Sequence, residues 1–275
     1  MSSTVGELRG FCYVADTAEY VSEALRSLAS LKEQMPNARV AFIAPRELFR
    51  PDAPIDAWIE LPIAAGGPIV KSAAYLAPFE RVVFLDTDTF ITDDLSSLFN
   101  ILDVFDFALA HEPTRGWDYP SDVPPSFCEL NTGVIAFRNN PKTRAFFDRW
   151  RRCYESILSQ HGLKNDQPAF RSTLWSSPEI RHATLPNEYN MVCHKGAAIA
   201  WKALVLHGRG DIPAIAADIN RKLGIRVILP GIGAFSGFRG RRFWIADYLR
   251  LSLGFLRVLF RPSLTQPGKS PVIWW

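Results

Sequence analysis

The sequence has 275 residues, of which 48% are hydrophobic and 21% are charged. This is an ordinary globular composition with enough apolar material for a sizeable core. The formal net charge of +3 does not indicate nucleic acid as a partner. The amino-terminal residues show no apolar signal segment, and no run of about eighteen uncharged apolar residues predicts a membrane-spanning helix. We therefore expect a cytoplasmic protein with reduced cysteines.

The charge is distributed unevenly along the chain. Residues 221–275 contain ten basic residues and a single acid, Asp247, whereas residues 1–220 are mildly acidic. A sign asymmetry of this kind is typical of a polyanionic partner or a membrane surface. The sequence thus predicts two parts, a main domain over residues 1–220 and a basic extension over residues 221–275.

Strand-like and helical segments alternate through the first part of the chain. Short apolar runs typical of buried strands occupy residues 10–15, 39–44, 57–61 and 81–85. Apolar residues at helical spacing run from Tyr20 to Leu31, and a second helix is expected from about Ile69 to Leu76. This alternation predicts an α/β fold with a mostly parallel central sheet covered on both faces.

The second part of the main domain is more mixed. Further strands are predicted at residues 107–110, 131–137 and 204–206, with one helix beginning near Pro141 and another near Asp166. Residues 112–128 are rich in Pro, Asp, Gly and Ser and predict a long loop. Loops of that length are usually functional or mobile.

Two acidic residues follow the strand predicted at residues 81–85. Asp86 and Asp88 are alternate residues at the carboxyl end of that strand, so both carboxylates can face one divalent ion. Mn²⁺ and Mg²⁺ take hard oxygen ligands and leave positions open for phosphate oxygens. The pattern therefore points to a metal site that serves a diphosphate leaving group.

Other interpretations of this acidic pair stay open. Asp-Thr-Asp can be a polar strand end, with Asp93 and Asp94 serving the next helix. Phosphatases of the haloacid dehalogenase superfamily also place D-x-D-x-[TV] after a strand, but here the fifth position is Phe90. Sugar-phosphate nucleotidyltransferases usually have a Gly-rich loop after the first strand, and residues 14–18 contain no glycine.

The segment from Arg81 to Ile91 resembles the donor-metal segment of glycogenin-like and lipopolysaccharide galactosyltransferase-like enzymes, which are retaining glycosyltransferases of the GT-A fold. Four further segments match that family in the same order: Asn131-Thr-Gly-Val134, Asp166-Gln167, Leu185-Pro-x-x-Tyr-Asn190, and His207 after an apolar strand. The resemblance covers roughly residues 8–210. It implies a GT-A fold for the main domain and transfer of a hexose from a UDP-sugar with retention.

The resemblance also implies roles for residues around the donor. Val14, Ala15 and Asp16 would meet the nucleoside, and Lys71 and Thr87 would contact the donor. The alternatives are that Asp16 caps the following helix and that Lys71 is a solvated lysine. These roles require a nucleotide-diphosphate sugar as the partner.

The remaining implied roles concern the metal and the reacting sugar. His207 would complete the Mn²⁺ or Mg²⁺ site with Asp86 and Asp88, and Asn131, Asp166 and Gln167 would lie at the sugar or the acceptor. The alternatives are an ordinary surface or core histidine, a turn asparagine and a helix-capping aspartate. Eukaryotic members carry Lys-Pro-Trp beyond this histidine, whereas this chain has Gly-Arg-Gly. We expect Arg209 to supply the missing charge.

The basic extension contains an amphipathic pattern between Phe243 and Arg261. Polar and small residues recur there at helical spacing, at Asp247, Arg250, Gly254, Arg257 and Arg261. The rest of the segment is almost wholly apolar, so the apolar face of a helix there must be buried against another surface. A helix lying on an anionic membrane and a helix packed on the domain or on a second copy of the chain both satisfy the pattern.

Taken together, the sequence predicts a metal-dependent hexosyltransferase that is cytoplasmic or peripheral on the cytoplasmic face of a membrane. The acceptor, whether carbohydrate, lipid-linked or protein, is not specified by the sequence. A haloacid dehalogenase-like phosphatase and a non-catalytic nucleotide-sugar binder associated with a membrane are the alternative functions.

Overall fold

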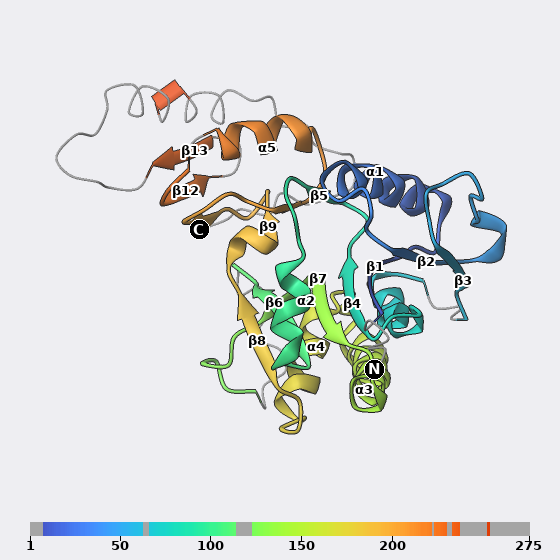
Figure 1. The fold of residues 1–275 in the computed structure, drawn as a ribbon. Coiled ribbons are helices and arrows are strands. Elements are labelled where there is room, and N and C mark those ends of the chain that lie inside the picture. The colour runs from blue at the N-terminus through green and yellow to red at the C-terminus, as the bar shows by residue number, and fades with distance from the viewer. Residues whose placement is uncertain are drawn as a thin grey trace, which may run out of the picture.

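A seven-stranded sheet forms the centre of the computed structural model, which describes residues 8–62, 66–113, 123–221, 223–229, 233–236 and 252–253 (Figure 1). The strand order is β3-β2-β1-β4-β7-β6-β8. The strands are β1 (Arg9–Val14), β2 (Val40–Ala44), β3 (Ala57–Glu60), β4 (Arg81–Leu85), β6 (Phe107–His111), β7 (Leu130–Arg138) and β8 (His182–Leu185). Only β7 runs antiparallel to its neighbours in this sheet, β4 and β6. The predicted mostly parallel α/β sheet is confirmed.

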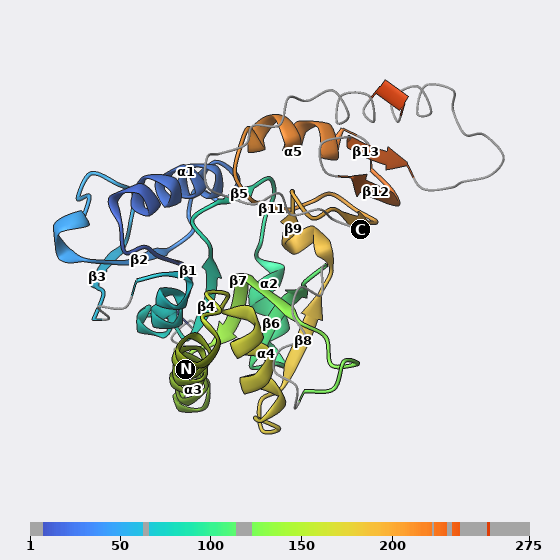
Figure 2. The same ribbon diagram turned by 180° about the vertical axis from the view of Figure 1, so that it is seen from behind.

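Helices cover both faces of this sheet. The helices of the described residues are α1 (Ala18–Gln34), α2 (Ser97–Asn100), α3 (Pro141–His161), α4 (Gln167–Trp175) and α5 (Ile212–Asn220), with short 3₁₀ helices η1 (Arg46–Leu48), η2 (Pro68–Leu76), η3 (Ile101–Asp103) and η4 (Asn187–Tyr189). Of these, α5 packs on strands outside the central sheet. Alternate residues of β1 point to opposite faces. Phe11 and Tyr13 pack on the side of α1 and α2, whereas Cys12 and Val14 pack on the side of η2, α3 and α4. Figure 2 shows α1 and α3 on opposite sides of β1.

Local signals in the sequence explain the helix boundaries. Thr17 caps α1 by accepting a hydrogen bond from the backbone of Tyr20. A capping box between Asn140 and Thr143 begins α3, which ends at Gly162 in the left-handed region. The helix predicted from Ile69 to Leu76 is instead the 3₁₀ helix η2.

Two small sheets lie beyond the carboxyl end of β4. One has the order β5-β11-β9, with β5 (Thr89–Ile91), β9 (Met191–Val192) and β11 (Val205–His207). Its antiparallel ladder pairs His207 with Thr89. This pairing brings a strand from late in the chain directly beside the residues that follow β4.

The other small sheet joins the two predicted parts of the chain. It has the order β10-β12-β13, with β10 (Ala197–Ile199), β12 (Arg226–Leu229) and β13 (Gly233–Ser236). Strand β12 of the predicted extension therefore pairs with a strand of the main domain, and β13 pairs with β12. The boundary at residue 220 stays a prediction.

The amphipathic helix predicted from Phe243 to Arg261 lies outside the described residues, except for Ser252 and Leu253, which are helical. Among the helices that the structure describes, none is long and apolar enough to cross a membrane. The four cysteines are free thiols, as predicted.

Candidate functional site

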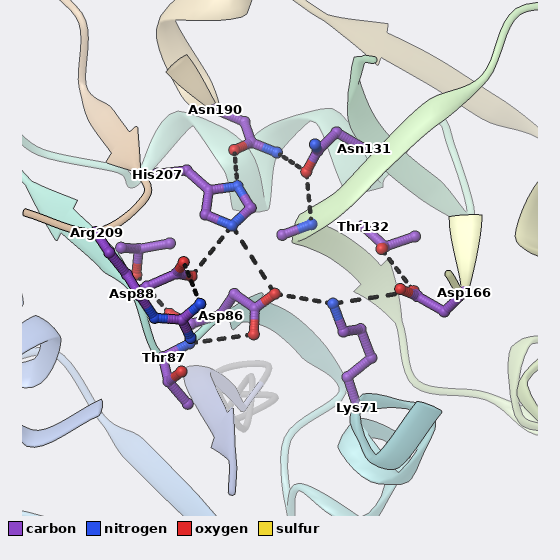
Figure 3. A network of polar contacts seen from close by, with 12 residues as sticks. Lys71, Asp86, Thr87, Asp88, Asn131, Thr132, Asp166, Asn190, His207 and Arg209 are labelled. Carbon is purple, nitrogen blue, oxygen red and sulfur yellow. Dashed lines mark hydrogen bonds and ion pairs between the residues drawn. The ribbon is translucent and has the colours of Figure 1, made fainter. Parts of the chain in front are cut away.

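Three side chains converge beyond the carboxyl end of β4. Asp86 and Asp88 follow β4, and His207 ends β11; each offers one ligand atom, and these atoms all lie within 4.8 Å of one another. Nε2 of His207 is 3.1 Å from Oδ1 of Asp88 and 3.9 Å from Oδ2 of Asp86. The predicted trio of metal-binding residues is therefore assembled in space (Figure 3).

The imidazole of His207 is held in a defined orientation. Its Nδ1 lies 3.0 Å from Oδ1 of Asn190, whose Nδ2 donates to Oδ1 of Asn131 at 2.8 Å. Because Asn190 presents its oxygen to the ring, Nδ1 is assigned a proton, and Nε2 faces Asp88 at 3.1 Å, where a cation could replace a proton. Asn190 thus fixes the orientation of the His207 ring.

The close approach of His207 explains why a glycine follows Asn131-Thr132 in the sequence. A Cβ at this position would lie 2.1 Å from Cε1 of His207 and 3.0 Å from Oδ1 of Asn131. Only a residue without a side chain leaves room for the imidazole beside β7. Asn131 also accepts a hydrogen bond from the backbone of Gly133. Its side chain therefore binds the local backbone and also belongs to the polar network around His207.

The charges of the trio depend on one another. Burial raises the pKa of Asp88, but the hydrogen bond and charge of His207 outweigh it and lower that pKa to about 2. Burial likewise opposes protonation of His207, yet its contact with Asp88 raises the pKa of the imidazole above its usual value. The trio therefore has a strong attraction for positive charge, which a divalent cation can satisfy in place of a proton.

Lys71 links the acidic pair to a third carboxylate. Its Nζ is 2.8 Å from Oδ2 of Asp86 and 3.9 Å from Oδ2 of Asp166, and the side chain is buried. Burial would lower the pKa of Lys71, but Asp166 and Asp86 outweigh it and raise the pKa above its usual range. Lys71 is thus a buried cation at the site, not a solvated surface lysine.

Asp166 precedes α4 without capping it by its side chain. The backbone of Gln167 is bound instead by Oδ1 of Asn165, while Oδ2 of Asp166 accepts from the hydroxyl of Thr132 at 2.7 Å. Burial raises the pKa of Asp166, although Lys71 opposes that change. The alternative of a side-chain helix cap is wrong, and Asp166 faces Lys71 (Figure 3).

Gln167 contacts two glutamates that the sequence did not single out. With its amide nitrogen turned toward them, it donates to Oε2 of Glu112 at 2.9 Å and to Oε1 of Glu129 at 3.2 Å. Glu112 also accepts from Asn131 at 2.9 Å. The available signal was the position of Glu112 directly after an apolar strand, as for Asp86.

A cavity of about 250 Å³ adjoins the metal-binding trio. Eight of the predicted residues line it, namely Val14, Asp16, Lys71, Asp86, Thr87, Asp88, His207 and Arg209. Ala15 does not, because its side chain is buried in the core on the α1 side. A larger cavity of about 400 Å³ lies at the amino ends of β1 and β2, lined by Arg9 and Arg39 among others, and holds none of the predicted residues.

Asp16 lies just beyond the carboxyl end of β1, and its side chain does not cap α1. Its Oδ2 accepts from the backbone of Gly67 at 3.3 Å, whereas Thr17 provides the cap. Its Oδ1 is buried and has no hydrogen-bond partner among the described residues. A buried acceptor without a partner beside a cavity is suited to a ligand that donates a hydrogen bond.

The side chains of Arg209 and Thr87 both donate hydrogen bonds to Glu23, which the sequence did not single out. Glu23 of α1 accepts from Nε and Nη2 of Arg209 at 2.8 and 3.1 Å, and from the hydroxyl of Thr87 at 2.6 Å. The guanidinium also lies 5.8 Å from the ring centre of Tyr20, and its Nη1 is 4.0 Å from Asp88. The Thr87 hydroxyl therefore orders Glu23, while Arg209 stands beside the metal-binding trio.

Comparison with protein families finds a similarity that covers part of the chain. Residues 81–200 match the family model of nucleotide-diphospho-sugar transferases. The matched span contains Asp86, Asp88, Asn131, Asp166 and Gln167. No curated protein sequence matches the chain.

Solved glycosyltransferases share the fold. The galactosyltransferase LgtC, in complex with donor and acceptor sugar analogues, has a TM-score of 0.51 at 12% identity over 74% of this chain and 87% of its own. Mouse xyloside xylosyltransferase 1 has a TM-score of 0.50 at 14% identity, over 73% and 97%. The glycosyltransferase GlyE of Streptococcus pneumoniae TIGR4 has a TM-score of 0.50 at 18% identity, over 94% and 66%. The chain thus has the GT-A fold, and its residues 81–200 are similar to nucleotide-diphospho-sugar transferases.

Proposed function

We propose that this protein transfers a hexose from a UDP-sugar to an acceptor, with retention of configuration and with Mn²⁺ or Mg²⁺ as cofactor. The observation that carries the proposal is the convergence of Asp86, Asp88 and His207 beside the cavity that Asp16 and Lys71 line. The choice of UDP and the retention rest on the family resemblance.

The chemistry of the trio fits a divalent cation. Two carboxylates and one imidazole with an available Nε2 are ligands that Mn²⁺ and Mg²⁺ accept, with positions left for other oxygens. When bound, such an ion neutralises the charge that develops on a departing diphosphate. Without it, two carboxylates at this place would repel a diphosphate.

The protein's own cations flank the same place. Lys71 reaches the trio from η2, and Arg209 reaches it from the segment after β11. Both are held by carboxylates, so their charges are fixed before a ligand arrives. We assign them to orienting and stabilising the diphosphate.

A second group of residues lies on the other side of Lys71. Thr132 orders Asp166, and Asn131 is tied to Asn190 and Glu112. Asp166 approaches Lys71 rather than the metal-binding trio. We therefore assign Asp166, Gln167 and Asn131 to the reacting sugar and the acceptor.

A screen of nucleotide sugars tests the proposal. The thermal stability of the full chain is measured with UDP, UDP-sugars and other nucleotide sugars, each with Mn²⁺ and with EDTA. A donor at about a hundred times its dissociation constant should add roughly 2.7 kcal/mol of stability. Release of UDP from the stabilising donor then measures turnover. Stabilisation without turnover of any donor would indicate a non-catalytic binder, and phosphate release from simple esters would favour the phosphatase alternative.

We also propose that the C-terminal part of the chain binds an anionic membrane surface from the cytoplasmic side. The ten basic residues of 221–275 support this. So does a group of exposed apolar side chains on and around β12: Trp201, Leu223, Ile225, Val227 and Leu229. A second copy of the chain is the alternative occupant of that surface.

A further inference from the structure

Glu112 and Glu129 form a pair of buried carboxyl groups behind the reacting side of the site. Glu112 follows β6 and Glu129 precedes β7, and the backbone of Glu112 donates to the carbonyl of Glu129 at 2.9 Å. Both side chains are almost fully buried. Burial of two acids side by side is costly unless donors compensate them.

The two carboxylates differ in the hydrogen-bond donors that surround them. Glu112 accepts from Nζ of Lys195 at 2.8 Å, from Asn131 at 2.9 Å and from Gln167 at 2.9 Å. Glu129 accepts from the same Gln167 amide at 3.2 Å. A single amide nitrogen therefore bridges both carboxylates and uses both of its N–H groups.

The pKa of Glu129 is raised from its usual value. Burial is the largest cause, and together with the charges of Glu112 and Asp166 it raises the pKa to about 7. Arg171 on α4 and Lys195 after β9 oppose the rise. Glu112 has a lysine and two amides as donors, whereas Glu129 shares one of those amides.

We propose that Glu129 is a positioning residue whose ionised carboxylate, together with that of Glu112, fixes the direction of the Gln167 amide. When Glu129 is ionised, the nitrogen of Gln167 is held by two carboxylates and the amide oxygen is directed away from them. When Glu129 is protonated, it is no longer a charged acceptor, and the contact with Glu112 at 2.9 Å is left to hold the nitrogen of Gln167, so the amide orientation is held less tightly.

A role for this pair in sugar transfer rests on the proposed function, in which Gln167 acts at the reacting sugar. The orientation of the Gln167 amide does not depend on the proposed function. An acidic solution would then loosen the orientation of the Gln167 amide without displacing the proposed metal ligands, because neither glutamate contacts them among the described residues.

The direct test is NMR of the Gln167 side-chain amide in the full chain between pH 5.5 and 8.5, with the resonance assigned by its loss in Gln167→Glu. The resonance should shift with a one-proton midpoint near pH 7. The shift should vanish in Glu129→Gln. In Glu112→Gln the midpoint should move to lower pH, because a negative neighbour is removed. Glu179→Gln, which alters an exposed glutamate, should change nothing.

A resonance that ignores pH, or that titrates unchanged in Glu129→Gln, would overturn the inference. The Glu112→Gln midpoint keeps the test decisive where Glu129→Gln does not fold.

The kinetic test separates this inference from the proposed function. The kcat for sugar transfer should fall toward a lower plateau as the pH drops through the midpoint, with the KM for the donor unchanged. The kcat of Glu129→Gln should show no such dependence on pH. A kcat that is constant between pH 6 and 8 overturns the inference. If the amide titrates but no nucleotide sugar is turned over, the proposed function fails and the positioning role stands.

Discussion

The guanidinium of Arg209 lies against the carboxylate of Glu23, with Nε 2.8 Å from Oε1 and Nη2 3.1 Å from Oε2. This contact joins α1 to the segment after β11, and it leaves Nη1 on the side of Asp88. An arginine held in this way keeps its remaining donors in one place, so a diphosphate meets a charge that is already oriented.

Glu23→Gln should therefore raise the KM for the donor about five- to tenfold, because a charge-assisted pair becomes a weaker neutral contact and Arg209 loses its orientation. The kcat should change little. Steady-state kinetics across donor concentrations measure both constants. Glu19→Gln, an exposed glutamate on the same helix, is the control. An unchanged KM in Glu23→Gln would remove Arg209 from the diphosphate site.

Asp88→Asn should abolish the dependence of UDP binding on divalent metal while the protein stays folded. The substitution removes the carboxylate nearest to His207, and the remaining ligands hold a cation poorly. Calorimetric titration of UDP, with Mn²⁺ and with EDTA, measures the difference. Equal UDP affinity of the parent protein in Mn²⁺ and in EDTA would contradict the metal site itself.

Asn190→Ala should weaken Mn²⁺ binding about 10- to 100-fold, because the imidazole of His207 loses the acceptor that fixes its tautomer and ring direction. His207→Ala should weaken it further. Metal titrations followed by calorimetry compare the two variants with the parent. If His207→Ala binds Mn²⁺ as the parent does, His207 is not a ligand.

Asp166→Asn should lower turnover far more than donor affinity, because Asp166 lies beyond Lys71 rather than among the metal ligands. Single-turnover kinetics and UDP binding report the two effects separately. Asp148→Asn, on the exposed side of α3, serves as the control. Full turnover in Asp166→Asn would exclude Asp166 from the reacting side.

The full chain should sediment with anionic vesicles and not with neutral ones, and salt should weaken the binding, since each basic residue near the surface contributes about 1 kcal/mol. A version that ends near Gly237 should lose most of this binding. A full chain that stays in solution with anionic vesicles would assign the apolar surface to a protein contact, which analytical ultracentrifugation would reveal as a dimer.

A linear pattern predicted the acidic pair Asp86 and Asp88 after β4, and the family resemblance added Asp166 before α4. The fold brings all three residues together. The direction of β7 could not be predicted in the same way. An apolar run has the same pattern in a parallel and an antiparallel strand, so the sequence gives no sign of the reversal.

The partners of the predicted residues were harder to find. Glu23 lies between the buried residues of an ordinary amphipathic helix, and its contact with Arg209 joins positions far apart in the chain. Glu129 precedes a strand without any motif, and its raised pKa comes from burial and from its neighbour Glu112. Long-range pairs of this kind are set by tertiary packing, which local patterns do not encode.

The proposed ligand His207 belongs to β11, in a small sheet, whereas Asp86 and Asp88 follow β4 of the central sheet. A cation bound by all three would therefore fasten two separate sheets to each other. Its binding free energy would add to the docking of β5, β9 and β11 against the rest of the domain. Backbone amides of β11 should then exchange with solvent more slowly when Mn²⁺ is present. The cation would therefore stabilise the packing of the small sheet even without a bound sugar.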